Sequence, residues 1–231
     1  MGIQVVDNDT RITPETRRLG LACAASGVLM ALLTIPLGIN IDDTSKEQWS
    51  YPHPTALFFA EAVLLTVAHL LSAAGFLGAL RLGASGTSKV GRTGLWAAVV
   101  GLVGLSVAEF VSGFIGAKAT DSGVATAVSA VFGITSIVFA LGAIVGGIAI
   151  LRVGVWPGPW RSTVLATGVV IIVLVTPANI SGSLPFRQGA LLIWSLLFIP
   201  LGLDVARGLS RKSSESRGLS SRPNAGEAPH R

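Results

Sequence analysis

Residues 123–151 read GVATAVSAVFGITSIVFALGAIVGGIAIL, an apolar run without a single charged residue. About 20 such residues are enough to cross the hydrocarbon core of a bilayer as an α-helix. The chain holds further apolar runs of similar character, and in lipid only helices or closed barrels satisfy every backbone hydrogen bond. The sequence therefore predicts an all-α, polytopic bundle of six transmembrane helices over residues 19–39, 55–80, 94–117, 123–151, 162–178 and 188–206.

The composition excludes an ordinary soluble domain. Hydrophobic residues make up 51% of the chain and charged residues only 13%, whereas soluble domains carry about 25% charged residues. The single cysteine, Cys23, excludes an internal disulfide and a zinc site built from Cys pairs. The sequence contains no nucleotide-binding or HExxH motif, so we expect neither a cofactor nor a metal.

Lysine and arginine are distributed unevenly between the two sides of the predicted bundle. The side that carries the termini holds all 17 of these residues except Lys46, Lys118 and Arg187. Because cytoplasmic loops are enriched in Lys and Arg, both termini are predicted to be cytoplasmic. An Arg-rich, Ala- and Gly-rich composition is typical of a GC-rich bacterial genome, so we expect a multi-pass protein of a bacterial plasma membrane.

The chain divides into a cytoplasmic N-terminal segment (1–18), a transmembrane domain (19–206) and a basic tail (207–231). The Ser-, Arg- and Gly-rich composition of the tail is typical of disorder. Its residues nearest the last helix, Arg207, Arg211 and Lys212, predict contact with anionic lipid headgroups. A tail that only fixes the topology is the simpler interpretation. No nucleic-acid motif accompanies the net charge of +5, so nucleic acid is not an expected partner.

Ionisable residues inside the apolar runs are the main candidates for a site, because a charged side chain in the membrane is costly. Glu61 lies about 9 Å, and Glu109 about 12 Å, from the same side of the bilayer at 1.5 Å per residue. Each has small residues on its helix face, which are typical of close helix contact. We therefore predict that the two carboxylates lie near each other inside the bundle; contact with the membrane interface or with neighbouring Ser and Thr is the alternative.

His69 lies deeper on the same predicted helix as Glu61. A histidine in this position would pass protons or bind a ligand, or would simply form a hydrogen bond to a neighbouring helix. The other two histidines, His53 and His230, fall outside the apolar runs, which argues against a haem held by two histidines.

Glycine is abundant, with 28 residues. Gly142 and Gly146 form a GxxxG pattern that is suited to close helix crossing. Gly75, Gly113 and Gly116 lie on the small-residue faces beside Glu61 and Glu109, and we expect them to pack against other helices. Whether such contacts lie within one chain, in a homo-oligomer or against a membrane partner stays open at this point.

The turn Leu151–Arg161, LRVGVWPGPWR, resembles the "LRxGxxPxW" inner turn of uncharacterised multi-pass membrane proteins of actinobacteria. The resemblance covers this turn and the six-span layout. Those proteins have no assigned activity, so the resemblance implies no functional residue.

Three functions remain for the predicted bundle, of which an intramembrane enzyme is the third. The first is a non-enzymatic integral membrane protein that acts as an accessory or envelope component through helix contacts. The alternative is a small proton- or cation-linked transporter that uses Glu61 and Glu109, with His69 as a further polar residue. An intramembrane enzyme would need an activated nucleophile or a metal cluster, which the sequence does not show.

The predicted orientation leads to a direct test. Alkaline phosphatase fused after Arg231 is expected to be inactive, because it would stay in the cytoplasm, and the same enzyme fused after Thr120 is expected to be active. The reverse pattern of activity would contradict the predicted topology.

Overall fold

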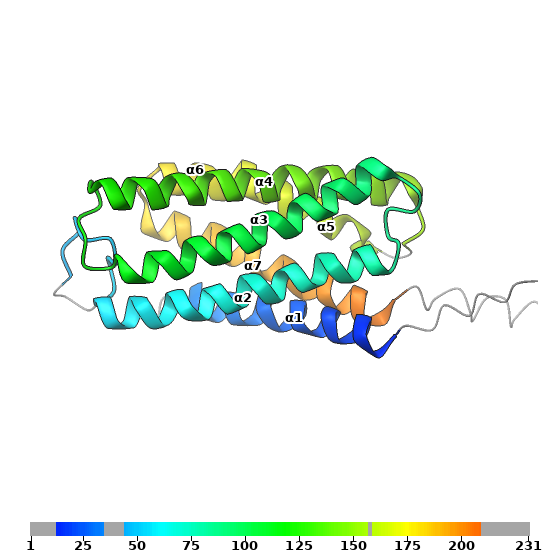
Figure 1. Ribbon diagram of the computed structural model, residues 1–231, viewed down its shortest axis with the longest axis horizontal. Helices are drawn as coiled ribbons and strands as arrows, with labels where there is room; N and C mark the ends of the chain where they lie inside the picture. Colours follow the sequence, from blue (N-terminus) through cyan, green and yellow to red (C-terminus); the bar gives the residue numbers. More distant parts are fainter. Residues whose placement is uncertain (1–12, 35–43, 157–158, 209–231) are drawn as a thin grey trace, which may run out of the picture.

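The structure, a computed structural model, describes residues 13–34, 44–156 and 159–208. Within these residues the fold is all-α, and six helices are long and apolar enough to cross a membrane. The helices lie along one another in an elongated bundle whose connections are at its two ends (Figure 1). The prediction of a six-helix membrane protein is confirmed.

Most spanning helices extend somewhat beyond the predicted apolar runs, because a helix continues into the polar interface, whereas α3 ends at Phe114, before the predicted end at residue 117. The first starts at Pro14 instead of residue 19, so it crosses the predicted domain boundary at residue 18. Residues 35–39 of that run lie outside the described part of the chain. The elements are α1 (Pro14–Thr34), α2 (Thr55–Arg81), α3 (Lys89–Phe114), α4 (Gly123–Val153), η1 (Pro159–Ser162), α5 (Thr163–Val170), the π-helical η2 (Ile171–Val175), α6 (Thr176–Ile180) and α7 (Leu184–Arg207).

The fifth spanning unit, Trp160–Ile180, combines η1, α5, η2 and α6. Its π-helical turn lies directly before Pro177, which has no backbone N–H to continue an α-helical hydrogen-bond pattern. The Ile171 carbonyl oxygen accepts the Thr176 N–H, five residues on, and also a hydrogen bond of 2.8 Å from the Thr176 hydroxyl. The irregular turn is thus a local adjustment to the proline.

The helices form a closed ring. Each packs on its neighbours in the chain, α7 closes the ring by packing on α1 and on α5, and α2 also contacts α7 across the interior. In Figure 1, α7 runs obliquely through the middle of the view and comes beside α1 where α7 finishes, while α3 crosses over towards α4. This arrangement makes the contact between α2 and α7 an inner seam of the bundle.

The packing of α3 on α4 depends on glycine. A Cβ atom added at Gly94 would lie 2.6 Å from the Gly146 backbone nitrogen, and one added at Gly142 would lie 2.5 Å from that of Ala98. Real side chains do not approach this closely, so the two backbones touch. The GxxxG pattern of Gly142 and Gly146 is therefore occupied by a helix of the same chain and does not face a second copy.

A second crossing of the same kind joins α1 and α7. A Cβ atom at Gly20 would lie 2.6 Å from the Gly202 carbonyl oxygen, and one at Gly202 would lie 2.5 Å from the Gly20 carbonyl oxygen. Ala24 and Ala206 complete two small-xxx-small pairs, since each lies four residues after one of these glycines. The ring is thus closed by direct backbone contact between its first and last helices.

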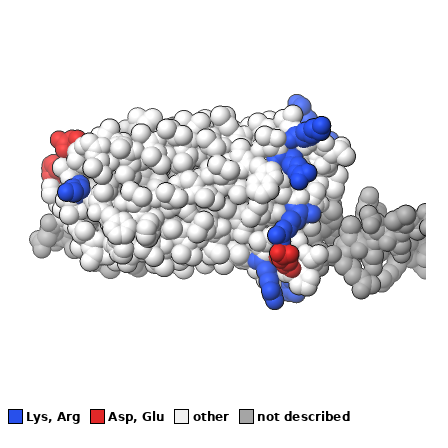
Figure 2. All heavy atoms as spheres, in the orientation of Figure 1, with Lys and Arg blue, Asp and Glu red and all other residues white. Residues whose placement is uncertain are grey.

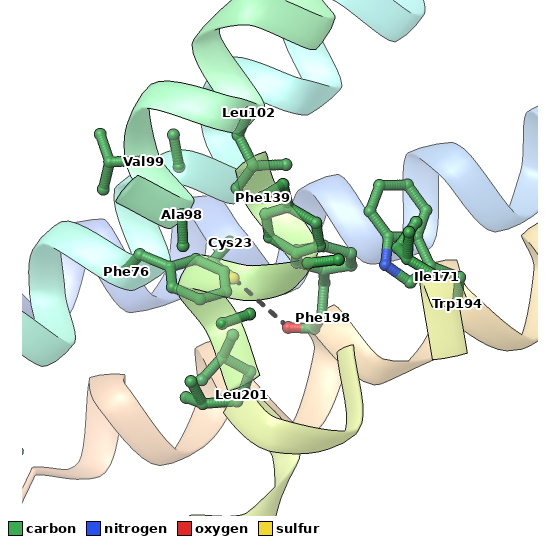
Figure 3. Close-up of a cluster of buried hydrophobic side chains, with 14 of the residues drawn as sticks. Cys23, Phe76, Ala98, Val99, Leu102, Phe139, Ile171, Trp194, Phe198 and Leu201 are labelled. Carbon is green, nitrogen blue, oxygen red and sulfur yellow. Dashed lines mark hydrogen bonds between the residues drawn. The ribbon is translucent and has the colours of Figure 1, made fainter. Parts of the chain in front are cut away.

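Four aromatic residues fill the middle of the bundle and are here termed the aromatic plug: Phe76, Phe139, Trp194 and Phe198. Their rings meet mostly edge to face, with centroids 5.6 Å apart for Phe76 and Phe139 and 5.0 Å apart for Trp194 and Phe198. Cys23 lies beside them and donates a 3.5 Å hydrogen bond to the Phe198 carbonyl oxygen (Figure 3). Cys23 is fully buried and packs as a small residue.

Charged residues gather at the two ends of the bundle (Figure 2). The end at which α1 begins and α7 finishes carries most of the described cations and is here termed the basic end. Its cations are Arg17, Arg18, Arg81, Lys89, Arg92, Arg152, Arg161 and Arg207. The uneven distribution agrees with the sequence pattern, and the side of the membrane on which this end lies stays a prediction.

The crossing of α3 and α4 yields a matched pair of substitutions. Gly142→Ala is expected to lower stability by about 1–3 kcal/mol, because the new methyl group meets backbone atoms that cannot move aside. Gly133→Ala on the same helix meets open space and is expected to raise stability by up to about 1 kcal/mol through helix propensity. Thermal unfolding in detergent measures both, and a Gly142→Ala protein as stable as the wild type would refute the close crossing.

Candidate functional site

At the end opposite the basic end, two connections pair to form a cap, here defined as residues 44–54 and 115–122. The Trp49 N–H donates to the Lys118 carbonyl oxygen at 2.9 Å, and the Thr120 N–H donates to the Glu47 carbonyl oxygen at 2.8 Å. At the exposed edge of the cap, a hydrogen bond from the Ser45 hydroxyl lowers the pKa of Glu47. The cap ties the connection before α2 to the connection after α3, above the ends of both helices.

His53, from the cap, reaches down to α2. Its Nε2 lies 3.7 Å from the Oε2 atom of Glu61, and the side chains are 31% and 23% exposed, respectively. His53 precedes the start of α2 at Thr55 by two residues, so the turn into the helix sets its position. Glu61 therefore lies beneath the cap, with part of its side chain exposed at the protein surface.

The register of α2 against α3 brings Glu109 to the level of Glu61. One turn deeper, the Thr66 hydroxyl donates to the Ser106 carbonyl oxygen at 3.3 Å, and the Ser106 hydroxyl donates to the Thr66 carbonyl oxygen at 3.2 Å. Towards the cap, Gly113 lies against Ala62, where an added Cβ atom would be 3.2 Å from the alanine Cβ. Glu109 lies between these two contacts on α3, and Glu61 directly precedes Ala62 on α2, so the two carboxyl groups are close enough to interact electrostatically.

Arg187, in the first turn of α7, completes the group. It interacts electrostatically with Glu61 across the seam between α2 and α7. We refer to His53, Glu61, Glu109 and Arg187 as the cap-end cluster. The cluster joins the cap, α2, α3 and α7, which are four parts of the chain that lie far apart in the sequence.

The charges of the cap-end cluster do not balance by themselves. Two carboxylates that interact in a poorly solvated place stay charged together only if cations compensate them. Arg187 supplies one permanent positive charge, and His53 supplies another only when it is protonated. The remaining negative charge is balanced by a proton on a carboxyl group, by protonated His53 or by a bound cation. The cluster therefore changes its state with a single proton or cation.

His69 does not join the cap-end cluster. It lies eight residues farther along α2 than Glu61, which is about 12 Å deeper. Its Nδ1 is 2.9 Å from the Leu65 carbonyl oxygen, and its ring lies beside Trp194 of α7 with centroids 5.9 Å apart. The imidazole is thus a buried side chain in the middle of the inner seam.

The remaining predicted residues lie at helix contacts or outside the described part of the chain. Gly75 faces the side chain of Cys23, and Gly116 faces Thr55 and Phe58. Arg207 ends α7 at the basic end, whereas Arg211 and Lys212 lie outside the described residues.

Sequence reasoning missed His53 and Arg187 as members of the site. His53 lies just before the helix that carries Glu61, but it is in a turn outside the apolar runs, and only ionisable residues inside those runs were considered as site residues. Arg187 counted only as a cation on the sparsely charged side. An arginine within the first turn of a membrane helix, at the depth of two carboxylates, was the pattern that could have revealed it.

Among the residues that the structure describes, no group of three or more His, Cys, Asp or Glu side chains is arranged to hold a metal ion. Comparison with known proteins gives no match, whether to a protein-family model, a curated protein or a solved structure.

The charge balance of the cluster predicts the effect of removing its permanent cation. Arg187→Gln is expected to lower stability by about 1–3 kcal/mol, because it leaves Glu61 and Glu109 without compensation. Adding Glu61→Gln is expected to restore most of the loss. Lys118→Gln, which removes an exposed cation of the cap, is the control and is expected to change stability little. If Arg187→Gln and Lys118→Gln change the stability equally in thermal unfolding, Arg187 does not compensate the charges of Glu61 and Glu109.

Proposed function

We propose that this integral membrane protein is a small, non-enzymatic, proton- or cation-linked transporter whose exchange site is the cap-end cluster. The observation that carries the proposal is the pairing of Glu61 with Glu109 beside a single permanent cation, Arg187. Such a group holds one exchangeable positive charge. Carboxylates within membrane helices are costly to the fold, which is why they mark ion and proton pathways in membrane proteins.

The surroundings of the pair support exchange at this place. The reciprocal hydrogen bonds of Thr66 and Ser106 fix α2 against α3 one turn deeper, so the spacing of the carboxylates is set by the backbone. Glu61 is partly exposed at the cap end of the bundle, which supports access for a proton or cation from solution. The cluster offers carboxylates, an imidazole and a guanidinium, which exchange protons or bind ions, and includes no hydroxyl or thiol nucleophile.

The second candidate function is the accessory or envelope component, which needs no exchange at the site. One observation favours it: the contact of His53 with Glu61 ties the cap to α2, which is a structural role for the carboxylate. In that case the cluster only holds the cap in place, and the protein acts through its surfaces.

We also infer that the basic end faces the cytoplasm of a bacterial cell and contacts anionic lipid headgroups. The support is the set of cations around that end, to which Arg207 belongs, together with the tendency of such cations to remain on the cytoplasmic side.

Glu109→Gln distinguishes the two candidate functions, because the substitution keeps the shape of the side chain and removes its charge. If the acid is kept for exchange at a cost to the fold, the variant is expected to have a higher Tm than the wild type in buffer without Na⁺ or K⁺. A cation that binds the folded protein raises its Tm. If Na⁺ or K⁺ raises the Tm of the wild type but not that of Glu109→Gln, the cluster is a cation site. If Glu109→Gln is more stable than the wild type and neither ion raises the wild-type Tm, the cluster is a proton site.

Asp121→Asn is the matched control, since Asp121 is an exposed acid of the cap outside the cluster. It is expected to keep the Tm and the cation response of the wild type. A Glu109→Gln protein with a Tm at or below that of the wild type in every buffer would contradict the exchange function and favour the accessory one.

A further inference from the structure

The inner seam between α2 and α7 holds a second polar pair, below the cap-end cluster. His69 of α2 and Trp194 of α7 lie with their ring centroids 5.9 Å apart and their planes inclined by 37°. The two side chains are only 5% and 4% exposed. Buried polar atoms are nearly always hydrogen-bonded, so the ring nitrogens of this pair need partners.

The hydrogen bond of His69 to its own helix determines what the rest of its ring offers. Because a carbonyl oxygen only accepts, the contact of 2.9 Å with Leu65 requires that Nδ1 carry the proton and donate it. In the neutral ring, Nε2 is then an acceptor. The structure gives this Nε2 no hydrogen bond to any described residue.

Trp194 supplies the complementary group. Its Nε1–H is a donor only, is fully buried and has no hydrogen-bond partner among the described residues. Two neighbouring helices thus present one unused donor and one unused acceptor at the same level of the bundle.

We propose that His69 and Trp194 form a binding site for one water molecule in the middle of the membrane-spanning bundle. A hydroxyl group is the chemistry that fits, because its oxygen accepts a hydrogen bond from Trp194 Nε1–H while its own O–H donates to His69 Nε2. A carboxylate or a carbonyl would satisfy only the tryptophan, and an ammonium would satisfy only the histidine.

The water site lies at the end of a row of polar side chains along α2 and α7. Glu61, His69 and Ser72 follow one another on a single face of α2, since their spacings of eight and three residues keep them within about 80° around the helix. Arg187 and Trp194 follow one another in the same way along α7. Below this level, Phe76 and Phe198 of the aromatic plug close the seam. The water site is thus the inner limit of a polar seam that starts at the cap.

The aromatic plug offers the Trp194 Nε1–H one alternative partner, the face of a phenylalanine ring. The Phe198 ring stands at 90° to Trp194 with centroids 5.0 Å apart, and the Phe139 ring at 79° and 5.7 Å. An N–H that points at the face of one of these rings makes a weak N–H···π contact. The experiment has to separate this contact from a hydrogen bond to water.

Indole N–H resonances in ¹H–¹⁵N spectra of the full chain in lipid nanodiscs make this distinction. The chain has five tryptophans, and Trp194→Phe assigns the resonance by removing it. A hydrogen bond to water oxygen moves the Trp194 proton downfield and yields a cross-peak to water, whereas the face of a phenyl ring moves it upfield. We expect the downfield position, the water cross-peak and loss of both in His69→Leu.

Trp96→Phe is the control, because Trp96 is exposed on α3 and its removal is expected to leave the Trp194 resonance unchanged. An upfield Trp194 resonance without a water cross-peak, or a cross-peak that persists unchanged in His69→Leu, would overturn the proposal. If His69→Leu does not fold, the wild-type spectrum alone decides. The result is independent of the proposed function, which concerns Glu61 and Glu109.

Discussion

The bundle depends on direct backbone contact between helices at small residues. In lipid, burial of apolar side chains gives no advantage to one helix neighbour over another, so close packing and polar contacts have to select the partners. Gly20 and Gly202 provide this contact between α1 and α7, and Gly94 and Gly142 provide it between α3 and α4. Because these crossings close the ring, they determine which side chains of α2 face the interior and which faces are left to lipid.

The interior that results has two different parts. Aromatic rings fill the middle, whereas polar groups of α2, α3 and α7 occupy the part towards the cap. The close-packed ring of helices holds those polar groups at fixed spacing, as a binding site requires. The carboxyl groups of Glu61 and Glu109 are therefore kept near each other by packing, with Arg187 beside them. When both groups are charged they repel each other, and a proton or a cation relieves that repulsion.

Much of the fold and part of the site could be predicted from the sequence. The six spans follow from length and hydropathy. The similar depth of Glu61 and Glu109 in the membrane follows from counting residues along the two helices that carry them. Arg187 and His53 could not be found in this way, because their place in the site depends on ring closure by α7 and on pairing of the cap. The contact of Gly20 with Gly202 depends on the same closure, between residues at opposite ends of the chain.

The proposed exchange at the cap-end cluster depends on an interaction between Glu61 and Glu109 within the folded bundle. The most direct measurement is a double-mutant cycle of Glu61→Gln and Glu109→Gln, followed by unfolding in detergent. We expect Glu109→Gln to stabilise the wild type more than it stabilises the Glu61→Gln protein, by at least about 0.5 kcal/mol. An equal effect of Glu109→Gln in both backgrounds would show that the carboxylates do not interact, and would contradict the account.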